Sequence, residues 1–188
     1  MHLTLPTWLT LARIAMVPVF VAAFFLPVES ANVICTALFA AAAITDWLDG
    51  WLARRLGQTS DFGAFLDPVA DKLMVAAALV LLVEADPTPW IGVPAVVIIG
   101  REIAISALRE WMAQIGASRS VAVSMVGKAK TMAQMVAVPF LLYDGALFGV
   151  VDTRVWGTGL IYVACVLTIW SMVYYLRKAM PEIRAKAR

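Results

Sequence analysis

The sequence predicts an all-α integral membrane protein, built as a bundle of six transmembrane helices. Hydrophobic residues make up 62% of the 188 residues, charged residues make up only 15%, and the mean hydropathy is +0.85. This composition is too apolar for a soluble domain of that length. Six apolar runs approach the length of about 20 residues that crosses a bilayer, and we expect them to form one domain over 1–188. The runs are 8–26, 33–52, 68–83, 91–111, 132–151 and 155–176.

The first run contains Arg13 and Pro18 and is not followed by a small-residue cleavage site, so we expect it to remain in the protein as a helix. The second run ends among charged residues, and the third begins among them. The third is the shortest because Asp71 and Lys72 interrupt its start. The halves of all six runs that lie away from these charges are apolar, which suits a polar site on one side of the membrane only.

Lysine and arginine residues between the runs lie almost entirely on one side. By the positive-inside rule, this asymmetry predicts that both termini are cytoplasmic and that residues 46–71 lie at the cytoplasmic edge. The net charge of +2 is too small to indicate nucleic-acid binding, whereas bases beside the membrane would meet anionic lipid head groups. The cytoplasmic bases are Arg54, Arg55, Arg109, Arg119, Lys128, Lys130, Arg177, Lys178, Arg184, Lys186 and Arg188.

Four aspartates stand where the second run ends and the third begins. A charged group at membrane depth costs from about 2.5 to more than 10 kcal/mol, so such groups usually mark a functional site. Asp46 and Asp49 are spaced i, i+3 and share one helix face. Asp67 and Asp71 are spaced i, i+4 and share another. A short connection makes the two helices antiparallel neighbours, so we expect the two acidic faces to meet.

Carboxylates at such close range repel one another unless cations offset their charge. Their hard oxygen atoms suit Mg²⁺, or alternatively Mn²⁺. The sequence therefore predicts that these four aspartates hold a metal centre with two ions. The alternative is that they are helix-end charges that face interfacial water.

Small residues accompany the acids. Gly50, Ala53 and Gly63 lie on or beside the acidic face, where the lack of bulk lets a ligand approach closely. Arg54 offers a planar fork that suits phosphate. Divalent cations, an arginine and a wall of small residues are the parts expected for binding a diphosphate and transferring a phosphoryl group.

Residues 46–71 match the signature D-x2-D-G-x2-A-R-x8-G-x3-D-x3-D at all eight specified positions. On this motif the chain resembles the CDP-alcohol phosphotransferases. Three further segments resemble the bacterial members of that family that use CDP-diacylglycerol and sn-glycerol 3-phosphate, so the resemblance covers nearly the whole chain. These segments are 5–13, 101–111 and 120–131.

The resemblance implies six transmembrane helices in the bacterial inner membrane, in a homodimer, with a polar cavity open to the cytoplasm. It implies that Asp46, Asp49 and Asp67 hold the metal ions that bridge the diphosphate of CDP-diacylglycerol. Asp71 would complete the second ion site and serve as general base.

In the same resemblance, Gly50, Ala53 and Arg54 receive the cytidine and phosphate portion of the donor, and Gly63 allows the loop to pack closely. Arg13 is either a phosphate contact in this donor site or a partner for one of the aspartates.

An acceptor that is itself a phosphate needs a cationic pocket. Arg101 and Arg109 lie two helical turns apart on roughly one face of the fourth run. Lys128 and Lys130 lead into the fifth. Together these side chains are candidates for gripping the acceptor phosphate. The alternative for the two arginines is a pair with the glutamate that follows each of them, or anchoring at the lipid interface.

Two other functions remain open from the sequence. Intramembrane carboxylates also mark ion pathways in small cation transporters, although a pathway needs polar groups through the full depth of the bilayer. A sibling enzyme would use the same donor and deliver the phosphatidyl group to inositol, serine or phosphatidylglycerol.

Overall fold

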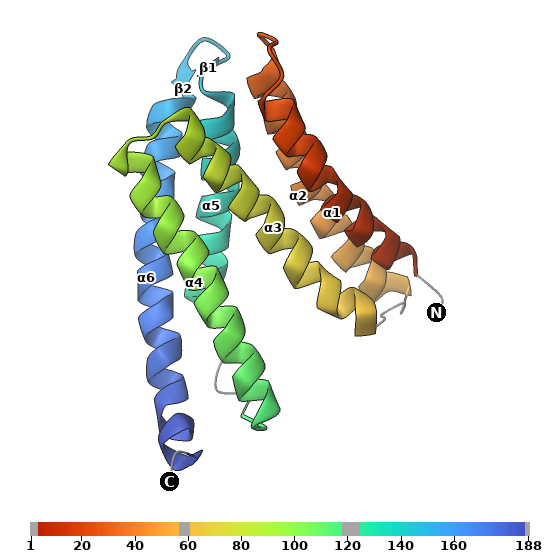
Figure 1. Ribbon diagram of the computed structural model, residues 1–188, viewed down its shortest axis with the longest axis vertical. Helices are drawn as coiled ribbons and strands as arrows, with labels where there is room; N and C mark the ends of the chain where they lie inside the picture. The colour runs from red at the N-terminus through yellow and green to blue at the C-terminus, as the bar shows by residue number, and fades with distance from the viewer. Residues whose placement is uncertain (1–3, 57–60, 118–124, 187–188) are drawn as a thin grey trace.

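The computed structural model describes residues 4–56, 61–117 and 125–186 (Figure 1). Six helices and one short hairpin make up these ranges. The elements are α1 (Leu5–Phe24), α2 (Ala31–Leu56), α3 (Asp61–Ala85), α4 (Pro89–Gln114), α5 (Met125–Tyr143), β1 (Ala146–Leu147), β2 (Val151–Asp152) and α6 (Thr153–Lys186).

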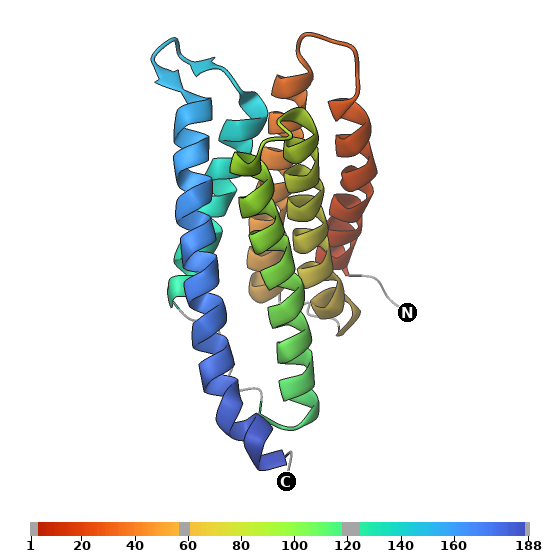
Figure 2. The same cartoon turned by 60° about the vertical axis from the view of Figure 1, so that its left-hand side comes forward.

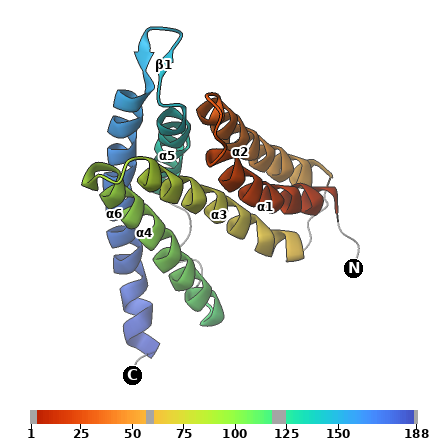
Figure 3. The ribbon, with the colours of Figure 1, turned by 45° about the horizontal axis from the view of Figure 1, so that its top comes forward.

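The helices form two groups of three, with α3 running between them (Figure 1, Figure 3). In the first group α1 contacts both α2 and α3, and in the second α6 contacts both α4 and α5. Contacts of α2 with α5 and of α3 with α4 join the two groups. The fold therefore places α1 between two neighbours on one side of the bundle and α6 between two neighbours on the other.

The turns from α1 to α2, from α3 to α4 and from α5 to α6 all lie at one end of the bundle, here called the hairpin end (Figure 2). The start of α1 and the end of α6 lie at the opposite end, here called the terminal end. An even number of antiparallel passes gives this arrangement, which agrees with the prediction that both termini share one side.

Four helices contain segments that are long and apolar enough to cross a membrane, within the described residues: Thr7–Phe24, Ala31–Leu52, Pro89–Gln114 and Thr153–Arg184. Charged residues near the starts of α3 and α5 interrupt their apolar stretches. Large apolar side chains project outward from the bundle, among them Trp90, Val96 and Met132, which are 68–72% exposed. Lipid is the environment that suits such a surface. The chain is therefore an all-α, multi-pass membrane protein.

The prediction that the fifth apolar run continues to residue 151 is wrong. Helix α5 ends at Tyr143, and β1 pairs antiparallel with β2 before α6 begins. The backbone turns through positive φ at Asp144, Phe148 and Gly149, with values of 43°, 53° and 71°, and this conformation cannot continue a helix. Apolar composition alone did not reveal the turn.

The larger apolar core lies in the hairpin-end half of the bundle. It includes Phe20, Phe39, Leu79, Ile98 and Ile161, one from each of five helices, all at most 2% exposed. A smaller core lies between α4 and α6 toward the terminal end. The buried charged groups lie in the terminal-end half, so the fold separates an apolar scaffold from a polar site.

Candidate functional site

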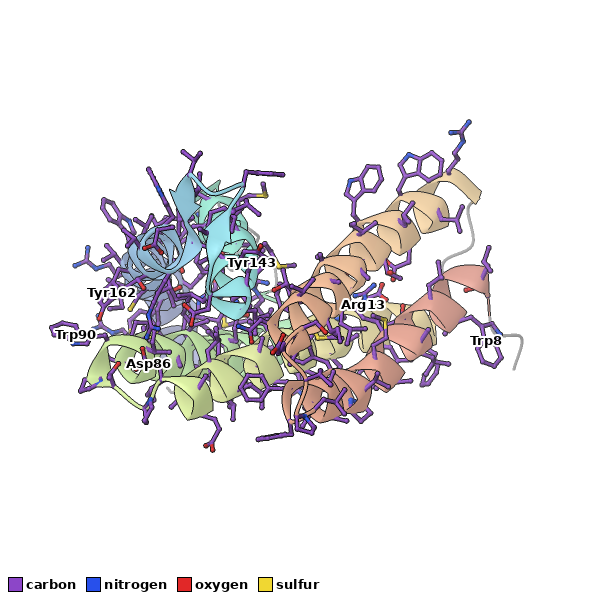
Figure 4. All side chains as sticks on the ribbon, turned by 90° about the horizontal axis from the view of Figure 1, so that it is seen from above. Trp8, Arg13, Asp86, Trp90, Tyr143 and Tyr162 are labelled. Atoms are coloured by element: carbon purple, nitrogen blue, oxygen red, sulfur yellow. The ribbon has the colours of Figure 1, made fainter. Side chains whose placement is uncertain are left out.

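The first polar cluster gathers around Arg13, which is 1% exposed and lies among α1, α2 and α3 (Figure 4). Its Nη1 donates to Asp46 Oδ1, and its Nη2 donates to Asp49 Oδ2. Asp49 is buried, whereas Asp46 is partly exposed. Of the two sequence alternatives for Arg13, the structure therefore shows the aspartate partner.

Thr10 links the same acids to α3. Its Oγ1 lies 2.6 Å from Asp67 Oδ1 and 3.4 Å from Asp49 Oδ2. Thr10 and Arg13 are spaced i, i+3 and share the face of α1 that packs on both neighbouring helices. The two acidic faces do meet as the sequence predicts, but α1 supplies the polar groups that bridge them. We call Thr10, Arg13, Asp46, Asp49 and Asp67 the anionic cluster.

The second polar cluster gathers around Glu102 on α4. Glu102 Oε1 accepts from Arg101 Nη1 at 3.2 Å and from Lys130 Nζ on α5. Arg101 and Lys130 are both buried. The predicted alternative for Arg101, a pair with the following glutamate, is thus observed, but the same glutamate also ties α4 to α5.

Helix α6 completes this second cluster. Arg101 Nη2 donates to Ser171 Oγ at 3.0 Å, and Arg109 Nη2 donates to Tyr175 Oη at 3.2 Å. Two cations on α4 thereby rest on the same face of α6, because Ser171 and Tyr175 are spaced i, i+4. We call Arg101, Glu102, Arg109, Lys130, Ser171 and Tyr175 the cationic cluster.

Asp71 lies at the border between the clusters. It lines one small pocket together with Arg13 and Asp46, and it lines a second together with Glu102 and Lys130. Gln134, Lys72 and Thr131 complete the polar lining of the second pocket, whose volume is about 40 Å³. A carboxylate thus faces an acid-rich site on one side and a base-rich site on the other.

The site residues that the sequence did not reveal lie on α1, α4 and α6, outside the aspartate motif. Thr10 is a polar residue one turn from Arg13, and that spacing was a usable signal. Ser171 and Tyr175 stand in an apolar run, where nothing in the local pattern distinguishes them from core residues. Glu102 was considered only as a partner for Arg101.

The remaining predicted residues are placed as follows. Gly50 is half-buried and Gly63 is buried, each on the helix that carries an aspartate pair. The side chains of Ala53, Arg54 and Lys128 lie outside the described residues, so the predictions for them are not addressed by the structure.

The four aspartates present hard oxygen donors of the kind that Mg²⁺ takes. As the side chains lie, no three acidic, histidine or cysteine groups in the described residues are close enough to share one ion. Arg13 instead supplies the positive charge between Asp46 and Asp49. The donor chemistry fits divalent ions, and in this structure one guanidinium supplies positive charge to that volume.

A wider groove lies away from these clusters. A groove of about 700 Å³ lies along the outer face of α6, lined by apolar side chains that include Trp170 and Tyr174, with Arg177 and Lys178 at one end. No carboxylate lies among these lining residues, so the groove is separate from the aspartates inside the bundle.

Residues 3–170 match the model of a family described as CDP-alcohol phosphatidyltransferase. The chain is 55% identical over 185 residues to a protein of Sodalis glossinidius, covering 97% of this chain and 98% of that one. It is 52% identical over 188 residues to a Yersinia pestis protein, covering 97% and 98%. A Haemophilus influenzae protein is 52% identical over 179 residues, covering 95% of each chain.

All three relatives are named CDP-diacylglycerol–glycerol-3-phosphate 3-phosphatidyltransferase. The family model spans most of the chain and includes every predicted site residue. This chain therefore belongs to the CDP-alcohol phosphatidyltransferase family.

Proposed function

We propose that this protein transfers the phosphatidyl group of CDP-diacylglycerol to sn-glycerol 3-phosphate, giving phosphatidylglycerophosphate and CMP. The names of relatives that are 52–55% identical over nearly the whole chain support both substrates. The structural observation that carries the proposal is the position of Asp71, which lines a pocket of the anionic cluster and a pocket of the cationic cluster.

The two substrates need different kinds of positive charge, and the two clusters can supply them. The diphosphate of the donor needs cations, which a cluster of carboxylates recruits. The phosphate of the acceptor needs fixed positive groups, which arginine and lysine supply. A group that serves the reaction between the two substrates belongs at their border, where Asp71 lies.

On the donor side, Asp46, Asp49, Asp67 and Asp71 would hold two Mg²⁺ ions, with Mn²⁺ as the alternative. When bound, such ions neutralise the charge that builds on the diphosphate oxygens. Gly50, Ala53 and Arg54 would receive the cytidine and phosphate portion, and Gly63 would let the loop pack closely.

Asp71 serves as the general base. Its carboxylate accepts the proton of the primary hydroxyl of glycerol 3-phosphate while that oxygen attacks the phosphorus attached to diacylglycerol. The bond from this phosphorus to the bridging oxygen breaks, and CMP leaves with the electron pair. A carboxylate is a weak base at its ordinary pKa of about 3.9, but the hydroxyl becomes more acidic as the new bond forms.

On the acceptor side, Arg101, Arg109, Lys128 and Lys130 would grip the phosphate of glycerol 3-phosphate. The pocket beside Lys130 has a volume of about 40 Å³, little more than the roughly 30 Å³ that one water occupies in the liquid. Substrate entry therefore requires Glu102 and Lys130 to separate, and the incoming phosphate replaces the carboxylate as the partner of the lysine.

We further propose that all six helices span the bacterial inner membrane, with the terminal end and its polar cavity toward the cytoplasm, and that the protein acts as a homodimer. Charge asymmetry supports the orientation. Cysteines introduced at Arg184 and Asp152 test it, since both positions are exposed and the native Cys35 and Cys165 are buried. An impermeant maleimide should label position 184 only from the cytoplasmic side and position 152 only from the outside. Reversed labelling would refute the orientation.

The reaction itself is tested with purified protein, CDP-diacylglycerol and one acceptor at a time, by following CMP release. We expect release with glycerol 3-phosphate and little with inositol, serine or phosphatidylglycerol. Rapid release with any of those three and not with glycerol 3-phosphate would assign a sibling reaction instead.

A further inference from the structure

Helix α6 contributes two fully buried polar side chains to the cationic cluster, Ser171 and Tyr175, both 0% exposed. The family model matches residues 3–170, so both lie just beyond it. Burying a hydroxyl costs free energy unless it is hydrogen-bonded. Here each hydroxyl accepts a hydrogen bond from an arginine: Ser171 from Arg101, and Tyr175 from Arg109. Their role is therefore to be sought in those arginines.

The ring of Tyr175 lies against both arginines of α4. Its centroid is 5.1 Å from the guanidinium carbon of Arg109 and 5.6 Å from that of Arg101. Both distances are within the range of a cation–π contact. The hydroxyl of the same ring accepts the hydrogen bond from Arg109. One side chain thus fixes two guanidinium groups whose backbone positions, eight residues apart, are separated by about 12 Å along a helix.

Ser171 fixes the remaining arginine contact. Its Oγ accepts from Arg101 Nη2 at 3.0 Å and donates to the carbonyl of Thr168 at 2.9 Å. The donated bond occupies the hydroxyl hydrogen, so the oxygen lone pairs point to the arginine. Ser171 therefore holds Arg101 in one orientation rather than merely filling space.

Both arginines keep donors that these contacts do not use. The Nε atoms of Arg101 and Arg109 are buried and have no hydrogen-bond partner among the described residues. A buried donor without a partner costs free energy, and an anion that reaches it recovers that cost. The two guanidinium groups are therefore held in place and still have an N–H donor available for a ligand.

We propose that Ser171 and Tyr175 are positioning residues that orient Arg101 and Arg109 for the phosphate of glycerol 3-phosphate. The proposal rests on the proposed function and extends it to a helix that the aspartate motif does not include. A planar guanidinium binds phosphate through two parallel hydrogen bonds only when its plane is correctly turned, so orientation controls affinity for the acceptor. The donor nucleotide lies at the other cluster and is unaffected.

The test compares Tyr175→Phe with Tyr174→Phe. The first removes the hydroxyl that holds Arg109 and keeps the ring. The second makes the same chemical change one residue away, on an exposed tyrosine whose ring contacts Lys178. Steady-state kinetics are measured twice for each enzyme, once varying glycerol 3-phosphate and once varying CDP-diacylglycerol, and melting temperatures are measured in parallel.

We expect Tyr175→Phe to raise the KM for glycerol 3-phosphate about tenfold, as loss of a hydrogen bond to a charged group does, with kcat and the donor KM nearly unchanged. Tyr174→Phe should match wild type in all values. Ser171→Ala, which frees Arg101 instead, should show the same pattern as Tyr175→Phe. Each residue is judged by its own variant.

A Tyr175→Phe enzyme whose acceptor KM stays within about twofold of wild type overturns the proposal for that residue. A parallel rise in both KM values with a lower melting temperature also overturns it, because that is the result of a purely structural role. If wild type itself releases no CMP with glycerol 3-phosphate, the proposed function fails and the inference falls with it. Normal wild-type turnover with an unaffected variant contradicts the inference alone.

Discussion

The anionic and cationic clusters are built in opposite ways. In the anionic cluster one buried cation, Arg13, lies between carboxylates of α2 and is joined to α3 through Thr10. In the cationic cluster one carboxylate, Glu102, lies between Arg101 and Lys130. Each central residue offsets only part of the charge around it. The first cluster is therefore still short of positive charge, and the second is still short of negative charge.

The two clusters coincide with the two groups of three helices. Each cluster forms where one helix packs against two others: α1 on α2 and α3, and α6 on α4 and α5. Asp71 on α3 faces both. Under the proposed function, the diphosphate of the donor and the phosphate of the acceptor would each have a cluster of its own, with Asp71 between them.

The largest effect is expected from removing the divalent cations that we propose for the anionic cluster. A chelator should abolish CMP release, and Mg²⁺ or Mn²⁺ should restore it. Asp49→Asn and Asp67→Asn should lower kcat by about a thousandfold or more, because each removes a charge that the ions need. Asp86→Asn, at a half-buried aspartate of the hairpin end, is the matched control. Full activity in EDTA would show that the anionic cluster does not work through divalent cations.

Asp71→Asn tests the residue that the clusters share. The amide cannot take a proton, so we expect kcat to fall about 10²- to 10⁴-fold, the usual contribution of a general base. Binding of CDP-diacylglycerol, measured by equilibrium titration, should weaken much less. Normal turnover at saturating donor together with weak donor binding would make Asp71 a binding group only.

Variants of Arg13 and Glu102, which lie at the centres of the two clusters, should regain stability with different ions. Arg13→Gln removes the ion-pair partner of the buried Asp49 and of the partly exposed Asp46, and breaking a buried ion pair costs about 3–5 kcal/mol. The melting temperature of this variant should therefore fall strongly in EDTA and recover in Mg²⁺, since the ions supply the missing charge. Glu102→Gln should recover with phosphate and not with Mg²⁺. If the same ion restored the melting temperature of both variants, the two clusters would not need charges of opposite sign.

Replacing either arginine of the cationic cluster by lysine should affect one substrate only. An ammonium cannot make the bidentate contact, and losing one charge-assisted hydrogen bond removes about 1.5–3 kcal/mol, roughly ten- to a hundredfold in acceptor affinity. Arg101→Lys and Arg109→Lys should raise the KM for glycerol 3-phosphate with little change in the donor KM. Arg177→Lys, on the exposed face of α6, is the control. A rise in the donor KM alone would place both arginines in the nucleotide site.

The smallest effect is expected at the hairpin end, where Arg154 pairs with Asp86 and Asp144. The hydroxyl of Thr88 and then Arg154 lower the pKa of Asp86 below its ordinary value. A carboxyl with a lowered pKa in the folded state stabilises the protein above its unfolded pKa, and that contribution is lost as pH falls through the folded pKa. Asp86 is half-buried and its ion pairs lie near solvent, so Asp86→Asn should leave activity unchanged and, above about pH 4, lower the melting temperature slightly. The difference from wild type should disappear as pH falls below that value, because the wild-type carboxyl is then protonated as well. A large loss of activity would link this end to the site.

The sequence alone determined the membrane class, the all-helical fold and the acidic motif. Apolar runs fix where helices cross a membrane, since backbone polar groups must be satisfied within each segment. Helical spacing fixed the shared faces of Asp46 with Asp49 and of Asp67 with Asp71. These are properties of residues close together in the chain, so a local pattern is sufficient to reveal them.

Only the tertiary structure decided which distant residues meet these groups. Thr10 and Arg13 reach the aspartates because α1 packs across both acidic helices. Ser171 and Tyr175 reach the arginines because α6 packs on α4. The end of α5 at Tyr143 was also a tertiary result, since the backbone turns there within an apolar stretch. Packing between helices depends on how whole surfaces fit together, and spacing along one helix does not identify which distant helix packs against it.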